Sequence, residues 1–127
     1  MYNKLQKMFY YLIDKNGGKF MNWKYEENRI YSEDESGEVL AEANFVHKEN
    51  GEIDIEHVYV NPKLRGQGVG GEAMNIVAEY LRKEGKRATA TCSYANAWFK
   101  KNQSDNEDII SNDMMNQAIA CSINGRH

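Results

Sequence analysis

The chain has 127 residues, of which 41% are hydrophobic and 28% are charged, and its formal net charge is −3. This length suits one domain with a modest core, and the acidic balance argues against general nucleic-acid binding, which needs a basic surface. No apolar run approaches the ~20 residues that span a bilayer, and the N-terminus lacks a secretory signal, so we expect a cytoplasmic protein without a membrane partner. Cys92 and Cys121 fit neither a disulfide framework nor, with the histidines, a zinc spacing, so we expect no metal.

Apolar residues recur at helical spacing from Leu5 to Ile13, and the glycines of Asn16-Gly17-Gly18 follow as a stop signal. The pattern predicts an N-terminal helical extension over residues 1–20. Its apolar face packs on the core or, alternatively, forms a homodimer contact.

Three strands are expected next. Residues 23–34 read as one strand that ends in an acidic turn, and residues 39–45 alternate apolar with polar side chains as a second strand does. The turn at His47–Gly51 leads to a third strand from Ile53, because Asn-Gly favours a hairpin. Together they predict an antiparallel meander.

The third strand breaks its own alternation. Ile53 and Ile55 share one face, whereas Val58 and Val60 have the opposite parity. A one-residue bulge near Glu56-His57 would return both pairs to one face. Alternatively, the two valines pack on the other side of a two-sided sheet.

The second half of the chain predicts a helix over Glu72–Glu84 that ends at Gly85, a strand over Arg87–Cys92, and a short helix over Tyr94–Asn102. Beyond Ser104 the chain is acidic, and we expect a solvated or weakly packed C-terminal extension over residues 104–127. The whole chain therefore predicts a single domain, 1–127, of the α+β class with one mixed sheet.

The stretch Val58–Gly71 contains a strand, a break at Asn61-Pro62 and four glycines in six residues, and a helix follows it. Such an arrangement points backbone N–H groups and a helix N-terminus at an anion. A dinucleotide fold is disfavoured, because residues 62–65 separate the strand from the first glycine and Arg87–Cys92 has no acidic residue for a ribose. No Gly-Lys-Ser/Thr follows the glycines, which excludes a Walker loop.

The run V-Y-V-N-P-K-L-R-G-Q-G-V-G resembles the acetyl-coenzyme A loop of the GNAT family of N-acetyltransferases. Arg65, Gly68 and Gly70 occupy the positions of that family's R/Q-x-x-G-x-G/A signature. Residues 91–102 are similar to a subgroup of short, single-domain predicted acetyltransferases with a cysteine at the end of strand five. The resemblance covers about Trp23–Asn102. It implies a GNAT-like, mostly antiparallel mixed sheet flanked by helices, with a splayed strand four.

The resemblance implies acetyl-coenzyme A (acetyl-CoA) as co-substrate. The glycine loop is expected to hold its pyrophosphate, with Arg65 as a charged donor, and the splayed strand to hold its pantetheine arm. Asn96 resembles a pantetheine-binding residue and is alternatively a helix N-cap. The predicted cofactor-binding residues are Val58, Tyr59, Val60, Arg65, Gly66, Gln67, Gly68, Val69, Gly70, Gly71 and Asn96.

The resemblance also implies direct attack of a deprotonated amine on the thioester, which needs a base, an acid and an oxyanion donor. Tyr94 occupies the position of the tyrosine that protonates the leaving thiolate, or else packs against Trp98. Glu56 or His57 is a candidate base, and Cys92 is either a nucleophile or a small buried residue. The acceptor is an amine of a small molecule or a protein. The alternative function is a CoA-binding or regulatory module with little or no catalysis.

Overall fold

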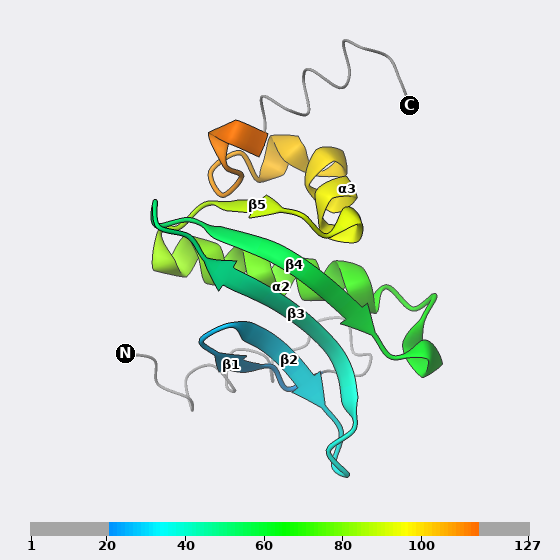
Figure 1. Cartoon of the computed structure of the whole chain (residues 1–127). Helices are drawn as coiled ribbons and strands as arrows, with labels where there is room; N and C mark the ends of the chain where they lie inside the picture. Colours follow the sequence, from blue (N-terminus) through cyan, green and yellow to red (C-terminus); the bar gives the residue numbers. More distant parts are fainter. Residues whose placement is uncertain (1–20, 115–127) are drawn as a thin grey trace.

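The computed structural model describes residues 21–114. The predicted N-terminal helix and the chain from residue 115 lie outside this range. Its centre is a five-stranded sheet in the order β1-β2-β3-β4-β5 (Figure 1). The strands are β1 (Lys24–Glu26), β2 (Arg29–Glu33), β3 (Val39–His47), β4 (Ile53–Val60) and β5 (Ala88–Ala90). The helices are α2 (Val69–Glu84) and α3 (Ser93–Lys101), and the short 3₁₀ turns are η1 (Pro62–Leu64) and η2 (Gln103–Asp105).

Strands β1 to β4 pair antiparallel in sequence order, and β5 joins β4 in parallel, which confirms the predicted mixed α+β sheet. The single strand predicted over residues 23–34 is wrong, because the chain reverses at residues 27–28 and forms the hairpin β1–β2. Tyr25 and Ile30 face each other across this hairpin. Their change of parity along the sequence, across a polar Glu-Glu-Asn run, is the signal for the turn.

The predicted bulge lies at Glu56. The register between β3 and β4 shifts there, between the pairs Asn44–His57 and Phe45–Ile55, so Glu56 has no opposite residue on β3. A bulge of this kind bends a strand and increases its local twist.

Beyond the bulge, Val58 lies opposite Ala43 and Val60 lies opposite Ala41. Both alanines are buried, and directly opposed residues share a face of a sheet. The valines therefore point to the core face, and the alternative of a two-sided sheet is wrong.

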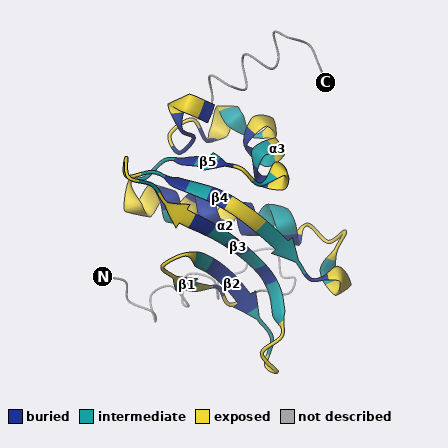
Figure 2. Ribbon diagram, viewed as in Figure 1, coloured by how far each residue is buried: buried dark blue, intermediate teal, exposed yellow. Residues whose placement is uncertain are grey.

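Helix α2 covers one face of the sheet, behind β3 and β4 in Figure 1, and buries its sheet-facing residues (Figure 2). It begins at Val69, earlier than predicted, because Gly68 adopts a left-handed conformation (φ 81°) and its carbonyl accepts the first helical hydrogen bond from Glu72 at 3.0 Å. It ends, as predicted, at a left-handed Gly85. Within residues 21–114 neither helix has the length and apolar character that a membrane span requires.

The expectation of a solvated or weakly packed segment after residue 104 is wrong for residues 106–114. Ile109 and Ile110 are buried, with exposed fractions of 1% and 2%. Ala88 donates to the carbonyl of Ile109 and accepts from Ser111, so this segment adds to the outer edge of β5. The prediction failed because the neighbouring acidic residues dominate the composition of this segment, whereas two isoleucines make its packing contacts.

Candidate active site

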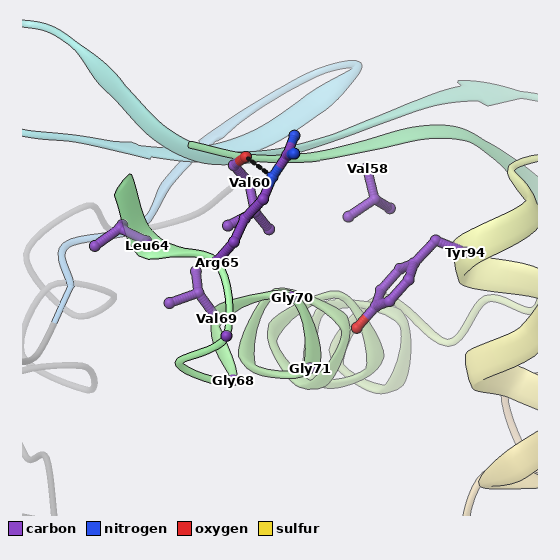
Figure 3. A pocket seen from close by; sticks show the side chains of 10 residues that line it. Val58, Val60, Leu64, Arg65, Gly68, Val69, Gly70, Gly71 and Tyr94 are labelled. Carbon is purple, nitrogen blue, oxygen red and sulfur yellow. Dashed lines mark hydrogen bonds between the residues drawn. The ribbon is translucent and has the colours of Figure 1, made fainter. Parts of the chain in front are cut away.

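A cleft with a volume of about 350 Å³ opens between the end of β4, the glycine loop and the start of α3 (Figure 3). Its walls come from the continuous stretch Val58–Gly71 and from Tyr94, which follows 23 residues after Gly71. The lining residues are Val58, Val60, Leu64, Arg65, Gly66, Gly68, Val69, Gly70, Gly71 and Tyr94.

The cleft exists because β4 and β5 separate. Their parallel pairing runs only from Ile53 to Ile55 on β4. The N–H groups of Thr91 and Cys92 then both donate to the Ile55 carbonyl at 3.0 Å, and α3 begins at the next residue. The bulge bends β4 at the same level, so β4 continues past Ile55 without β5 beside it. The predicted splayed strand is confirmed.

The open edge of β4 carries main-chain donors. The Asn61 N–H donates to Leu40 on β3 at 2.9 Å, and hydrogen bonds in an antiparallel pair alternate along the strand. The N–H group of Tyr59 therefore points toward β3. The N–H groups of Val58 and Val60 point away from β3, into the space between β4 and β5. These two amides are what an extended ligand lying along β4 would meet.

The glycine loop presents more donors. Gly66 and Gly68 have φ values of 83° and 81°, which favour glycine, and they carry the chain into α2. Because the first helical hydrogen bond comes from Glu72, the N–H groups of Val69, Gly70 and Gly71 precede it and have no partner within the helix. Unpaired first-turn amides and the positive end of the helix dipole make a site for an anion.

Arg65 lies at the mouth of the cleft, where its Nε donates to the Val60 carbonyl at 3.4 Å (Figure 3). The exposed guanidinium adds positive charge beside the loop. Leu64 also lines the cleft and was not predicted. Its signal in the sequence is that it is the one aliphatic side chain between Pro62 and Gly68.

Tyr94 reaches the cleft from the first turn of α3 and points toward the start of α2 (Figure 3). A Cβ atom built on Gly70 would lie only 2.7 Å from the Tyr94 hydroxyl oxygen. Trp98 makes its ring contact with Phe99, at 5.8 Å between centroids. Tyr94 thus extends across the cleft, and 44% of its surface is exposed. Its hydroxyl fits beside α2 because Gly70 has no side chain.

The other predicted catalytic residues do not line the cleft. Glu56 and His57 are exposed at the bulge, and His57 lies on the opposite face of the sheet from Val58. Cys92 is a half-buried free cysteine that packs against the core just before α3.

Three of the predicted cofactor residues, Tyr59, Gln67 and Asn96, also lie outside the lining. Asn96 sits inside α3, and its side-chain amide donates to the Ala90 carbonyl at 3.1 Å. The N-cap of α3 is Cys92, so the alternative of Asn96 as the N-cap is wrong. Among residues 21–114 no group of three His, Cys, Asp or Glu side chains is placed to hold a metal ion.

A family model and one solved structure agree with this fold. The sequence model of the GCN5-related N-acetyl-transferase family matches residues 28–109. The solution NMR structure of a GCN5-like protein from Staphylococcus aureus is 33% identical, with a TM-score of 0.60, over 72% of this chain and 88% of that one. The ribosomal-protein-alanine N-acetyltransferase from Brucella melitensis biovar Abortus 2308 is 13% identical, with a TM-score of 0.43, over 57% of this chain and 60% of that one. The search of curated proteins found no match.

The mixed sheet, its parted strands and its glycine loop define a GNAT-like acetyltransferase fold. The chain belongs to the GCN5-related N-acetyltransferase family, whose members use acetyl-CoA.

Proposed function

We propose that this chain transfers the acetyl group of acetyl-CoA to an amine by direct attack. The observation that carries the proposal is the continuity of the cleft. The β4 edge amides, the first-turn amides of α2 and the Tyr94 hydroxyl all border one open space.

In this proposal the pyrophosphate lies on the amides of Val69, Gly70 and Gly71, with Arg65 beside it. The pantetheine arm extends along β4 and bonds the N–H groups of Val58 and Val60 as an additional strand would. The thioester then lies near the bulge, where the strand bends.

The amine nitrogen attacks the thioester carbonyl carbon, and a C–N bond forms as the carbonyl oxygen takes negative charge. The Val58 N–H is the donor nearest the bulge and stabilises that charge. The C–S bond then breaks, and the leaving thiolate takes the Tyr94 hydroxyl proton, which solvent replaces. For this step the exposed Tyr94 side chain turns from Gly70 toward the thioester once the cofactor is bound. Glu56 or His57, both exposed at the bulge, takes the proton of the amine directly or through water.

The acceptor is an amine of a small molecule or a protein. A cytoplasmic location, the absence of nucleic-acid and membrane partners, and a homodimer contact through residues 5–13 stay predictions.

Calorimetric titration with CoA and acetyl-CoA, followed by thiol release from acetyl-CoA across an amine panel, tests the proposal. We expect binding to the wild type and turnover with at least one amine. No binding at millimolar ligand would refute it. Binding without turnover on any amine would favour the CoA-binding module, which the exposed positions of Glu56 and His57 outside the cleft also favour.

A further inference from the structure

The glycine loop is fixed mainly at its two ends. Residues 62–68 are exposed, except for the half-buried Leu64. The flanking residues Asn61 and Val69 are buried, with exposed fractions of 3% and 5%. Val69 is anchored by α2, so the conformation of the loop depends on how Asn61 is held.

Asn61 organises the strand end of the loop. Its Oδ1 accepts from the Lys63 N–H at 2.9 Å, and its carbonyl accepts from the Leu64 N–H at 2.8 Å. These two bonds form the turn η1. The next backbone bond in the loop, from Arg65 to the Pro62 carbonyl, is longer at 3.3 Å.

The β2–β3 hairpin sets the orientation of the Asn61 side chain. Its Nδ2 donates to Glu38 Oε2 and to the Val39 carbonyl, both at 3.1 Å. The two N–H groups of the amide are therefore satisfied on the hairpin side, and Oδ1 is directed at the Lys63 N–H. A buried polar group with every partner present has one preferred orientation.

Glu38 holds the loop a second time. Its Oε1 accepts from Lys63 Nζ at 2.9 Å, so one carboxylate binds both Asn61 and Lys63, 23 and 25 residues later in the chain. The hydrogen bond from Lys63, with that from Asn61, holds the pKa of the Glu38 carboxyl below its usual value. The carboxylate is therefore charged at neutral pH.

We infer that Glu38 and Asn61 are positioning residues for the pyrophosphate: the β2–β3 hairpin holds η1 in place, and η1 sets the path of residues 65–68, which places Arg65 and the loop amides beside the first-turn amides of α2. This inference rests on the proposed binding of CoA by that loop. A loop that is already ordered before CoA binds loses less conformational entropy on binding than a flexible loop does. Loss of Glu38 leaves Asn61 without one partner and frees Lys63, so the loop samples more conformations before CoA arrives.

The test compares Glu38→Ala and Glu38→Gln with Glu35→Ala, a matched loss of an exposed carboxylate from the same hairpin. Because Glu38 is exposed, all three variants should fold. We expect Glu38→Ala to raise the calorimetric Kd for CoA about threefold to tenfold. Glu38→Gln, whose amide oxygen still accepts from Asn61, should fall between it and the wild type. Glu35→Ala should bind as the wild type does.

Two further measurements separate positioning from a general loss of stability. Glu38→Ala should raise the KM for acetyl-CoA and leave kcat largely unchanged, because Tyr94 and the bulge stay in place. Without any CoA, amide hydrogen exchange at Lys63 and Leu64 should accelerate in Glu38→Ala, because Asn61 accepts both N–H groups.

Unchanged Kd and unchanged exchange in Glu38→Ala would overturn the inference while leaving the proposed function intact. An equal effect of Glu35→Ala would also overturn it, because hairpin charge alone would then explain the change. If the wild type bound no CoA, the proposed function would fail, and with it the inferred role for the pyrophosphate. The exchange data would still show whether Glu38 orders the loop.

Discussion

The substitution Gly70→Ala should change the shape of the cleft while leaving the stability of the fold nearly unchanged. Gly70 lies in the first turn of α2, where alanine suits the helix better than glycine does. The added methyl group would meet the Tyr94 hydroxyl at 2.7 Å and the attached ring carbon at 3.1 Å. Both contacts are closer than ordinary van der Waals separation, so Tyr94 must move.

The two effects on the free energy of unfolding oppose each other. Replacing glycine by alanine within a helix stabilises it by up to about 1 kcal/mol. Moving Tyr94 off its preferred rotamer costs about 0.5–1.5 kcal/mol, and its partial exposure lets the ring swing outward instead. We therefore expect the free energy of unfolding to change by less than about 1 kcal/mol, which is a shift of a few degrees in Tm. Acetyl transfer should fall, because the hydroxyl is displaced and the cleft is narrowed.

Thermal unfolding and acetyl-CoA kinetics, measured on the same preparations, test this expectation. Gly71→Ala is the stability control, because a Cβ there meets no atom within 4 Å among the described residues. It should gain the helix stabilisation without moving Tyr94. Gly70→Ala is also made in a Tyr94→Ala background to complete a double-mutant cycle.

In that background the methyl group has no hydroxyl to displace, so Gly70→Ala should affect kcat much less. Two outcomes would refute the reasoning. One is destabilisation of Gly70→Ala by more than about 2 kcal/mol, since the contact would then be rigid. The other is an equal loss of activity in both backgrounds, since the methyl group would then act on the cofactor and not through Tyr94.

Three other predictions concern the loop, the cysteine and the C-terminal segment. Gly68→Glu should bind CoA more than about tenfold more weakly than Gly68→Ala, which has the same backbone strain but no added charge. Equal affinities of the two variants by calorimetry would mean that the loop is not the phosphate site. Cys92→Ala should keep thiol release within a few-fold of wild type, whereas a loss on the order of 10³-fold would indicate a covalent intermediate. The hydrogen bond from Arg82 holds the pKa of Asp108 below its ordinary value, so its stabilisation is present above about pH 4 and is lost as the pH falls through the lowered pKa. Urea midpoints between pH 7 and pH 3 should therefore fall less steeply in Asp108→Asn, and identical slopes would contradict this assignment.

The parts of the fold that follow from the sequence are those in which local chemistry decides. The parity break between Ile55 and Val58 predicts the bulge, because side chains must return to one buried face. The four glycines in six residues predict the loop between the third strand and the helix, and Gly85 predicts the end of α2. Each of these features depends on residues that are close together in the sequence, so it can be predicted from a single sequence.

The remaining parts depend on contacts between distant segments. Nothing near Glu38 indicates that it meets Asn61, because its partner is set by the path of the β2–β3 hairpin. Tyr94 was predicted from a resemblance, but its approach to Gly70 depends on where α3 leaves β5. Likewise, Ile110 packs beside Ala88 only after the chain has passed through α3, and periodicity reports nothing about such pairings.

The segment after α3 also limits how far the C-terminal end of this folding unit can be truncated. A chain cut at Asn102, where the resemblance of the sequence ends, would lose Ile109 and Ile110 and leave the outer edge of β5 unpaired. Exposed edges of this kind promote association between chains. The shortest fragment that keeps this pairing therefore extends past α3, at least to Ser111, and the buried Met114 favours an end beyond that residue.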